Sequence, residues 1–179
     1  MKKIILMLTL AAIGLGAMTQ AQTPAQKKSL VTYFSASGVT RHAAQQLAEI
    51  IGADLYEITP EVAYTDADLD WRNKESRSSV EMRDKTSRPA IKGHIENLAA
   101  YDTIYIGFPI WWNVAPTIIN TFIEAHDLAG KTLAPFATSG SSSIDNSCKE
   151  LRATYPNLRW RDGLLLNKID KDTILHWVR

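Results

Sequence analysis

Residues 30–41 read LVTYFSASGVTR, an apolar run that passes directly into small hydroxyl residues and one glycine, Gly38. The apolar run predicts a buried strand, and the spacing of apolar residues from Thr40 onward predicts an amphipathic helix. A turn from a strand into a helix leaves helix amides without partners, and hydroxyls and a glycine let a ligand approach them closely. The stretch therefore predicts a binding site for an anion, in particular a phosphate monoester.

The same residues are also typical of a plain turn in which serine and threonine only cap the helix. Two common nucleotide loops are excluded, because a Walker loop ends in Gly-Lys and a dinucleotide-binding fingerprint has several spaced glycines. This turn contains neither pattern. A phosphate cradle and a helix cap therefore remain alternatives at this point.

The composition indicates one globular domain. The chain has 179 residues, of which 45% are hydrophobic and 22% are charged, as is usual for such domains. The net charge is only +1, whereas proteins that bind nucleic acid or anionic membranes have a pronounced basic surface. We therefore expect no nucleic-acid partner.

The first 21 residues have the pattern of a secretory signal. Lys2 and Lys3 precede an apolar run over residues 4–18, and a polar stretch follows that ends in the small residue Ala21. An uncleaved anchor is the alternative, but the run is shorter than the roughly 20 residues that a membrane-spanning helix needs. We predict a signal peptide at 1–21, a linker at 22–28 and a domain at 29–179, exported to the periplasm and without a membrane span.

Short apolar strands alternate with helical periodicity along the rest of the chain. The expected strands cover residues 30–35, 54–59, 103–109, 132–138 and 160–166, and the expected helices cover residues 40–51, 115–125, 144–155 and 170–179. Such alternation indicates an α/β fold with a parallel sheet of five strands, helices on both faces, and ligands at the carboxyl ends of the strands.

Two further loops follow strands at the same predicted edge as the turn at Gly38. The third strand leads into Pro109, Ile110, Trp111, Trp112 and Asn113, and the fourth leads into residues 138–143, which are rich in serine. Indole faces stack on flat rings, and backbone amides bond to polar ring edges. The three loops together predict a planar, phosphorylated aromatic ligand.

These three motifs, in this order and at strand ends, resemble the flavodoxins. The match is closest to flavodoxin-like bacterial proteins with Pro109-Ile110-Trp111-Trp112 after the third strand and Thr138-Ser139-Gly140 after the fourth. The resemblance covers residues 29 to about 170. It implies a flavodoxin-like doubly wound sheet of order 2-1-3-4-5, with helices on both faces and non-covalent FMN at the switch point.

The resemblance also implies which residues contact FMN. In the first loop, the hydroxyls of Ser35, Ser37 and Thr40 would bond to the phosphate. The backbone amides of the following residues would complete the cradle: Gly38, Val39, Thr40 and Arg41. Trp111 or Trp112 would flank the isoalloxazine, although both could instead pack in the core. The remaining residues would shape the second loop (Pro109, Ile110, Asn113) or offer amides to the pyrimidine edge (Ser139, Gly140, Ser141), unless the third loop is a plain polar connection.

FMN would make the protein a redox protein without a catalytic acid or nucleophile of its own. Loss of the signal would leave 18 basic and 19 acidic residues, whereas electron shuttles of this family are strongly acidic. Because of this departure, two functions remain possible. The protein could transfer electrons to a redox partner, or it could be an FMN-dependent oxidoreductase that reacts with a nicotinamide donor or a small substrate. The alternative is a flavodoxin-shaped binding module without a redox cofactor.

Residues 60–89 form a longer connection than a minimal flavodoxin has. A connection of this length is typically a functional cover, so Tyr64, Trp71 and Arg77 could lie over the flavin or hold an anionic substrate. The alternative is a solvated excursion with ion pairs such as Glu81 to Lys85, which have helical spacing.

The remaining ionisable candidates have structural interpretations. Cys148 shares one predicted helix face with Ile144 and Leu151, which indicates a buried structural thiol. The four histidines lack the spacing of metal ligands, so we expect no metal site. Each is interpreted as a structural or surface residue: His42, His94, His126 and His176.

Overall fold

The structure, a computed structural model, describes residues 28–179. The predicted signal peptide and almost all of the predicted linker therefore lie outside the described residues. Lys28, predicted as the last linker residue, is the first residue of β1 and pairs with Tyr101 in the sheet. Within the described part, no helix has the length and apolar character needed to cross a membrane.

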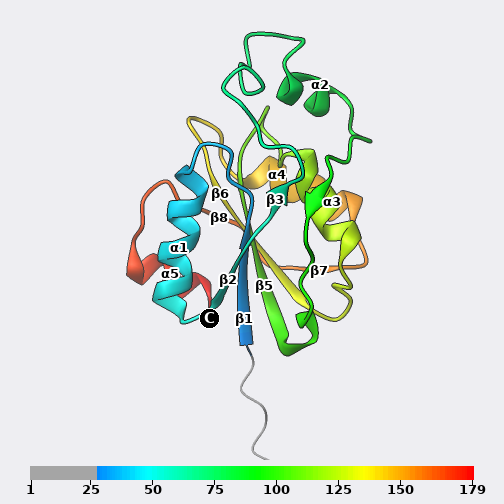
Figure 1. The fold of residues 1–179 in the computed structure, drawn as a ribbon. Helices are drawn as coiled ribbons and strands as arrows, with labels where there is room; N and C mark the ends of the chain where they lie inside the picture. Colours follow the sequence, from blue (N-terminus) through cyan, green and yellow to red (C-terminus); the bar gives the residue numbers. More distant parts are fainter. Residues whose placement is uncertain (1–27) are drawn as a thin grey trace, which may run out of the picture.

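A parallel sheet forms the centre of the domain (Figure 1). Its strands are β1 (Lys28–Tyr33), β2 (Asp54–Glu57), β5 (Tyr101–Pro109), β6 (Thr132–Thr138), β7 (Arg159–Trp160) and β8 (Leu164–Leu165). Their order is β2-β1-β5-β6-β7, with β8 also paired to β6, and every pairing in this sheet is parallel. The predicted order 2-1-3-4-5 is confirmed.

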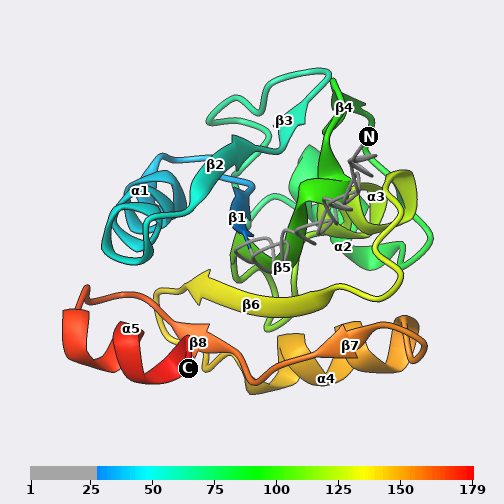
Figure 2. The ribbon, with the colours of Figure 1, turned by 90° about the horizontal axis from the view of Figure 1, so that it is seen from below.

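Helices cover both faces of the sheet, as predicted (Figure 2). One face carries α1 (Val39–Ile51) and α5 (Lys171–Trp177), and the other carries α3 (Thr117–Ala125) and α4 (Asp145–Thr154). Successive strand residues point to opposite faces, so Leu30 packs in the core beneath α3 and α4 while Val31 packs beneath α1. The central strands are therefore buried on both sides.

One residue of β5 without a side chain makes room for an aromatic ring of the neighbouring strand. Gly107 lies directly opposite Phe136 of β6, and a Cβ atom at Gly107 would be only 2.2 Å from Cζ of that ring. Phe136 is fully buried. The ring therefore lies across β5 where any larger residue would place its side chain.

The prediction of one continuous last strand over residues 160–166 is wrong, because the chain forms β7 and β8 with a break between them. At this break Gly163 approaches α4 so closely that a Cβ atom would be 2.5 Å from Sγ of Cys148. Cys148 is buried at 4% exposure, which confirms its structural interpretation, and burial raises the pKa of its thiol. The close contact with α4 interrupts the regular pairing.

The second predicted strand also divides. β2 ends at Glu57, and β3 (Thr59–Pro60) pairs instead with β4 (Ile91–Lys92) in a small antiparallel sheet. Between these two strands the chain forms α2 (Arg77–Arg83), and a short 3-10 helix, η1 (Leu98–Ala100), precedes β5. In Figure 1 the segment with α2 rises above the carboxyl ends of the main strands.

Ion pairs hold the end of this segment to the helices below. Arg88 makes two bonds of 2.8 Å to the carboxylate of Glu124 on α3, and Lys85 lies 3.2 Å from Glu150 on α4. The expected pair between Glu81 and Lys85 is wrong, because α2 ends at Arg83 and helical spacing is lost before Lys85. The segment is a partly helical cover that is fixed to the body of the domain.

Candidate functional site

The three predicted loops come together at the carboxyl edge of the sheet. Oγ1 of Thr40, at the start of α1, lies 2.8 Å from Oγ1 of Thr138, at the end of β6. The ring of Phe34, just before the first loop, contacts Trp111 of the second loop edge-on with centroids 5.6 Å apart. These two contacts join all three loops through buried or half-buried side chains.

The first loop leaves the start of α1 open to an anion. Gly38 has a left-handed φ of 88°, and no atom lies within 4 Å of the position its Cβ would take. No side chain caps α1, and its first turn contains no acidic residue. The first amides of a helix have no partner within the helix and carry its positive partial charge, so the geometry fits a phosphate.

The hydroxyls of this loop are engaged to different degrees. Ser35 accepts a hydrogen bond of 3.1 Å from the amide of Gly38, and Thr40 is 1% exposed and bonded to Thr138. Ser37 is exposed, and its hydroxyl makes no hydrogen bond within the described residues. Ser37 is therefore the hydroxyl of this loop most available to a ligand, while Ser35 and Thr40 shape the loop.

Arg41 contributes to the site only through its backbone. Its Nη2 lies 2.6 Å from Oε1 of Glu57, and the hydroxyl of Tyr33 donates to the other oxygen of the same carboxylate at 3.2 Å. The guanidinium is thus paired on the β2 side of α1. The amide of Arg41 stays in the first turn of the helix, where the sequence predicted it.

The second loop is a tight turn with Trp112 at its tip. Trp111 and Val114 exchange two backbone hydrogen bonds of 3.0 Å, and the residues between them, Trp112 and Asn113, have φ values of 45° and 65°. Two successive positive φ values are the mark of a type I′ turn, and φ > 0 is uncommon for an aromatic residue. Asn146 of α4 donates a hydrogen bond of 3.0 Å to the carbonyl of Asn113 and supports the turn.

The two tryptophans have different environments. Trp111 is half-buried and packs edge-on against Phe34 and Tyr64, with centroid distances of 5.6 and 5.4 Å. Trp112 is 49% exposed. Trp111 is therefore a packing residue, and Trp112 is the tryptophan with a free face for a planar ligand.

The third loop is held by a residue outside the three predicted loops. The side chain of Asn167, which follows β8, makes two hydrogen bonds to the backbone of Ser139. Its Oδ1 accepts a bond of 2.8 Å from the Ser139 amide, and its Nδ2 donates a bond of 2.8 Å to the Ser139 carbonyl. The hydroxyl of Ser139 accepts bonds from the amides of Ser141 and Ser142 at 3.3 and 2.9 Å. Most amides expected to face a ligand therefore stabilise the loop, and Gly140 is the exception.

A pocket of about 390 Å³ lies where the second and third loops meet. Its lining includes most of both predicted loops and one residue of the long cover: Trp71, Ile110, Trp111, Trp112, Asn113, Ser139, Gly140, Ser141 and Ser142. Ligand pockets for small molecules and cofactors start at about 300 Å³. Pro109 is the last residue of β5, where it pairs with Thr138, and it does not line the pocket itself. The first loop does not line this pocket.

The cover contributes two of its three predicted residues to this region. Tyr64 packs on Trp111, and Trp71 lines the pocket at 64% exposure. Arg77 is engaged elsewhere, because its Nε lies 2.7 Å from Glu81 and its guanidinium stacks 3.9 Å above the ring of Tyr64. Tyr64 also donates to Glu81, and burial together with this carboxylate raises the pKa of Tyr64. Arg77 thus supports Tyr64 and is not free to hold an anionic substrate.

His126 is a neutral structural residue. Its Nδ1 lies 2.8 Å from the carbonyl of Phe122, and its Nε2 accepts a bond of 3.2 Å from the amide of Ile95. Burial lowers the pKa of His126, and the neighbouring His94 acts in the same direction. Among residues 28–179 no group of three or more potential metal ligands is present.

We expect this histidine to make the stability depend on pH. Because the pKa is lower in the folded state, His126 stabilises the fold above its ordinary pKa of about 6.5, and this contribution is lost as the pH falls. Urea unfolding should show that the free energy of unfolding falls more between pH 7.5 and pH 5 for the wild type than for His126→Gln. His42→Gln, on the exposed side of α1, is the control and should behave as the wild type does. Equal losses in wild type and His126→Gln would contradict this assignment.

Comparisons with known proteins agree with this geometry. A family profile described as Flavodoxin matches residues 28–179. The structure of a candidate flavoprotein from Bacteroides eggerthii DSM 20697 has 58% identity and a TM-score of 0.83, with 84% of this chain and 95% of that chain covered. One from Bacteroides uniformis ATCC 8492 has 58% identity and a TM-score of 0.81, with 85% and 97% covered.

A more distant structure shares the fold. It is a flavoprotein from Lactobacillus acidophilus NCFM in complex with FMN, with 21% identity, a TM-score of 0.66, and 86% of this chain and 99% of that chain covered. No curated protein sequence matches the chain.

Proposed function

The chain belongs to the flavodoxin family, and from this premise we propose that it binds FMN without a covalent bond and acts as a redox protein. The observation that carries the proposal is the convergence of an uncapped helix start, an exposed indole and a serine-rich loop at one edge of the sheet. This edge is where open α/β sheets bind ligands. The FMN complex of the Lactobacillus acidophilus protein, which has the same fold, supports the choice of ligand.

Different residues would bind the phosphate, the isoalloxazine ring and the polar edge of that ring. The amides of Val39, Thr40 and Arg41, with the hydroxyl of Ser37, would hold the phosphate, while the Gly38 amide is bonded to the Ser35 hydroxyl. Trp112 would lie against the isoalloxazine, and Gly140 would offer its amide to the polar edge of the ring. When bound, FMN supplies transfer of one or two electrons, while the protein sets its potential by hydrogen bonds and by excluding water.

The reaction is proposed to involve a small donor or substrate, such as a nicotinamide, and electron transfer to a protein partner is the second candidate. The sequence carries nearly equal numbers of basic and acidic residues, so it lacks the strong field that steers a charged shuttle to its partner. The pocket beside Trp112 is also bordered by the exposed Trp71. A small planar molecule could therefore reach the flavin from this side.

An absorption spectrum of the protein, isolated from its native compartment, tests the proposal. We expect a yellow protein whose released chromophore is FMN. A colourless protein that also fails to bind added FMN would instead support a flavodoxin-shaped binding module.

Sequencing of the mature amino terminus from a periplasmic fraction tests the export proposal, for which we expect cleavage after Ala21.

The two tryptophans provide a further prediction. Trp112→Ala should weaken FMN binding by about tenfold, because an exposed stacking face is lost, with little change in the free energy of unfolding. Trp111→Ala should lower that free energy by about 2 kcal/mol, because contacts with Phe34 and Tyr64 are lost. FMN fluorescence titration and urea unfolding of both variants measure the two effects. The reverse pattern would show that Trp111 is the ligand-facing residue.

A further inference from the structure

An acidic residue of the cover, Glu81 on α2, binds two side chains at once. Its Oε2 accepts a hydrogen bond of 2.5 Å from the hydroxyl of Tyr64, and its Oε1 accepts one of 2.7 Å from Nε of Arg77. The guanidinium of Arg77 also lies 3.9 Å above the ring of Tyr64, and it donates a bond of 2.7 Å to the carbonyl of Val62. Each of the three side chains therefore contacts the other two.

This cluster is shielded from water, unlike the ion pair beside it. The side chain of Glu81 is 13% exposed, whereas that of Glu75, which pairs with Arg83 at 3.8 Å, is 80% exposed. Exposed ion pairs contribute little to stability, but loss of one partner of a shielded pair leaves the other uncompensated. Burial and the carboxylate of Glu81 also raise the pKa of Tyr64, so its hydroxyl remains a donor. The geometry of the cluster therefore depends on the charge of Glu81.

Tyr64 connects this cluster to the proposed flavin site. Its ring contacts Trp111 edge-on with centroids 5.4 Å apart, and it contacts Phe34 at 5.6 Å. Phe34 and Trp111 also contact each other, so the three rings form one cluster between the cover, the carboxyl end of β1 and the second loop. Trp111 pairs with Val114 at the base of the turn that carries Trp112. A displacement of Tyr64 would therefore reach the base of this turn.

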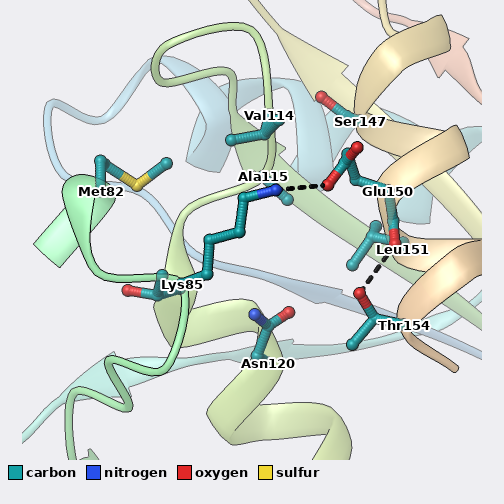
Figure 3. Close-up of a pocket in the computed structure, with 10 residues that line it drawn as sticks. Met82, Lys85, Val114, Ala115, Asn120, Ser147, Glu150, Leu151 and Thr154 are labelled. Carbon is teal, nitrogen blue, oxygen red and sulfur yellow. Dashed lines mark hydrogen bonds and ion pairs between the residues drawn. The ribbon is translucent and has the colours of Figure 1, made fainter.

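The next residue of α2 lies near the other end of the same base. Met82 and Val114 line one small pocket between the cover, α3 and α4 (Figure 3). Just beyond α2, the cover is paired to α4 through Lys85 and Glu150, as Figure 3 also shows. α2 is thus linked to both residues that close the turn, to one through Tyr64 and to the other across this pocket.

We infer that Glu81 is a positioning residue of the proposed flavin site, an inference that rests on the proposed function. Its carboxylate holds the ring of Tyr64 against Trp111. This contact keeps the turn in the conformation that presents Trp112 to the ligand. Trp112 has a φ of 45°, which is uncommon for an aromatic residue, so the turn needs such support. Glu81 does not line the pocket beside Trp112, and its effect on FMN binding is therefore indirect.

Titration with FMN, followed by flavin fluorescence, tests this role in the variant Glu81→Gln. The amide group has only one acceptor atom, so either Tyr64 or Arg77 loses its partner. We expect about fivefold weaker FMN binding, because a misplaced aromatic contact costs about this much affinity. Glu75→Gln is the matched control, since it removes the same charge from an exposed ion pair of the cover. It should bind FMN as the wild type does.

A double variant distinguishes positioning from a general loss of stability. If Glu81 acts through Trp112, Glu81→Gln should weaken FMN binding little further in a protein that already carries Trp112→Ala. Independent losses that multiply in the double variant would overturn the inference, and so would wild-type affinity in Glu81→Gln. Should Glu81→Gln not fold, Tyr64→Phe takes its place in the same comparison, because it keeps the ring and removes only the bond to Glu81.

A measurement without FMN separates this inference from the proposed function. In NMR spectra of the apo protein, we expect the indole N–H signal of Trp112 to shift in Glu81→Gln and to stay unchanged in Glu75→Gln. An unchanged signal in both variants would overturn the positioning role even if the wild type binds FMN. A shifted signal in Glu81→Gln, with no FMN binding by the wild type, would instead overturn the proposed function and leave the link between Glu81 and the turn in place.

Discussion

Replacement of Ser37 by glutamate is expected to weaken FMN binding by at least about a hundredfold. The new carboxylate would lie at the start of α1, where the phosphate is proposed to bind. Two like charges about 4 Å apart repel by about 4 kcal/mol near a protein surface, and each 1.4 kcal/mol or so is a factor of ten in affinity. Because the Ser37 side chain is exposed and makes no hydrogen bond within the described residues, the fold should not change.

Titration of the apo protein with FMN, followed by flavin fluorescence, measures this effect. Gln45→Glu is the matched control, because it adds the same charge to an exposed position of α1 beyond its first turn. The control should bind FMN nearly as well as the wild type does. If Ser37→Glu and Gln45→Glu bind equally well, the phosphate does not lie at the start of α1.

Thr40 is a less suitable position than Ser37 for an acidic substitution. From the sequence, Ser37 and Thr40 are equivalent hydroxyls of one loop. In the structure Thr40 is buried and bonded to Thr138 across the sheet edge, so an acidic residue there would break the contact between two loops. Loss of FMN binding in such a variant would not separate a binding effect from a folding effect.

The fold could be predicted from the sequence because its signals are local and periodic. The alternation of apolar strands with helical spacing, as in residues 30–51, sets the element order, and short connections then leave few possible topologies. The positions of the three loops follow from that order alone. For the same reason, the end of the last predicted strand could have pointed to Asn167 as a further residue at this edge.

The parts that could not be predicted depend on contacts between distant residues. The break at Gly163 arises from its approach to Cys148, and the end of β2 arises from pairing of Thr59 with Lys92. The positive φ of Trp112 depends on the hydrogen bonds between Trp111 and Val114. No periodicity in the sequence encodes these contacts, so the sequence left the roles of the two tryptophans open.

Gly107→Ala is expected to be the most destabilising small substitution in the sheet. A Cβ atom at Gly107 would lie 2.2, 2.5 and 2.8 Å from three carbons of the Phe136 ring, distances that no side chain tolerates. Phe136 is fully buried beneath α1 and α5, so its ring has little room to move. Overpacking of a core costs about 1–3 kcal/mol and occasionally more, and we expect about 3 kcal/mol here.

Urea unfolding of three variants separates this contact from a general effect of alanine. Gly140→Ala, where no atom lies within 4 Å of the new Cβ, should change the free energy of unfolding by at most about 0.5 kcal/mol. The double variant Gly107→Ala with Phe136→Leu should regain part of the loss, because the smaller side chain makes room for the new methyl group. A stable Gly107→Ala, or a double variant with purely additive losses, would contradict the contact.

The same substitution should also affect the proposed flavin site. β5 and β6 pair from Thr103 with Thr132 to Pro109 with Thr138, so a displacement at Gly107 lies two residues from the end of this ladder. Beyond that end lie the turn of Trp112 and the loop of Gly140. A Gly107→Ala protein that still folds, for example in sucrose, should therefore bind FMN more weakly than the wild type, whereas Gly107→Ala with Phe136→Leu should recover affinity together with stability. Recovery of stability without affinity would mean that the strand ends do not position the two loops.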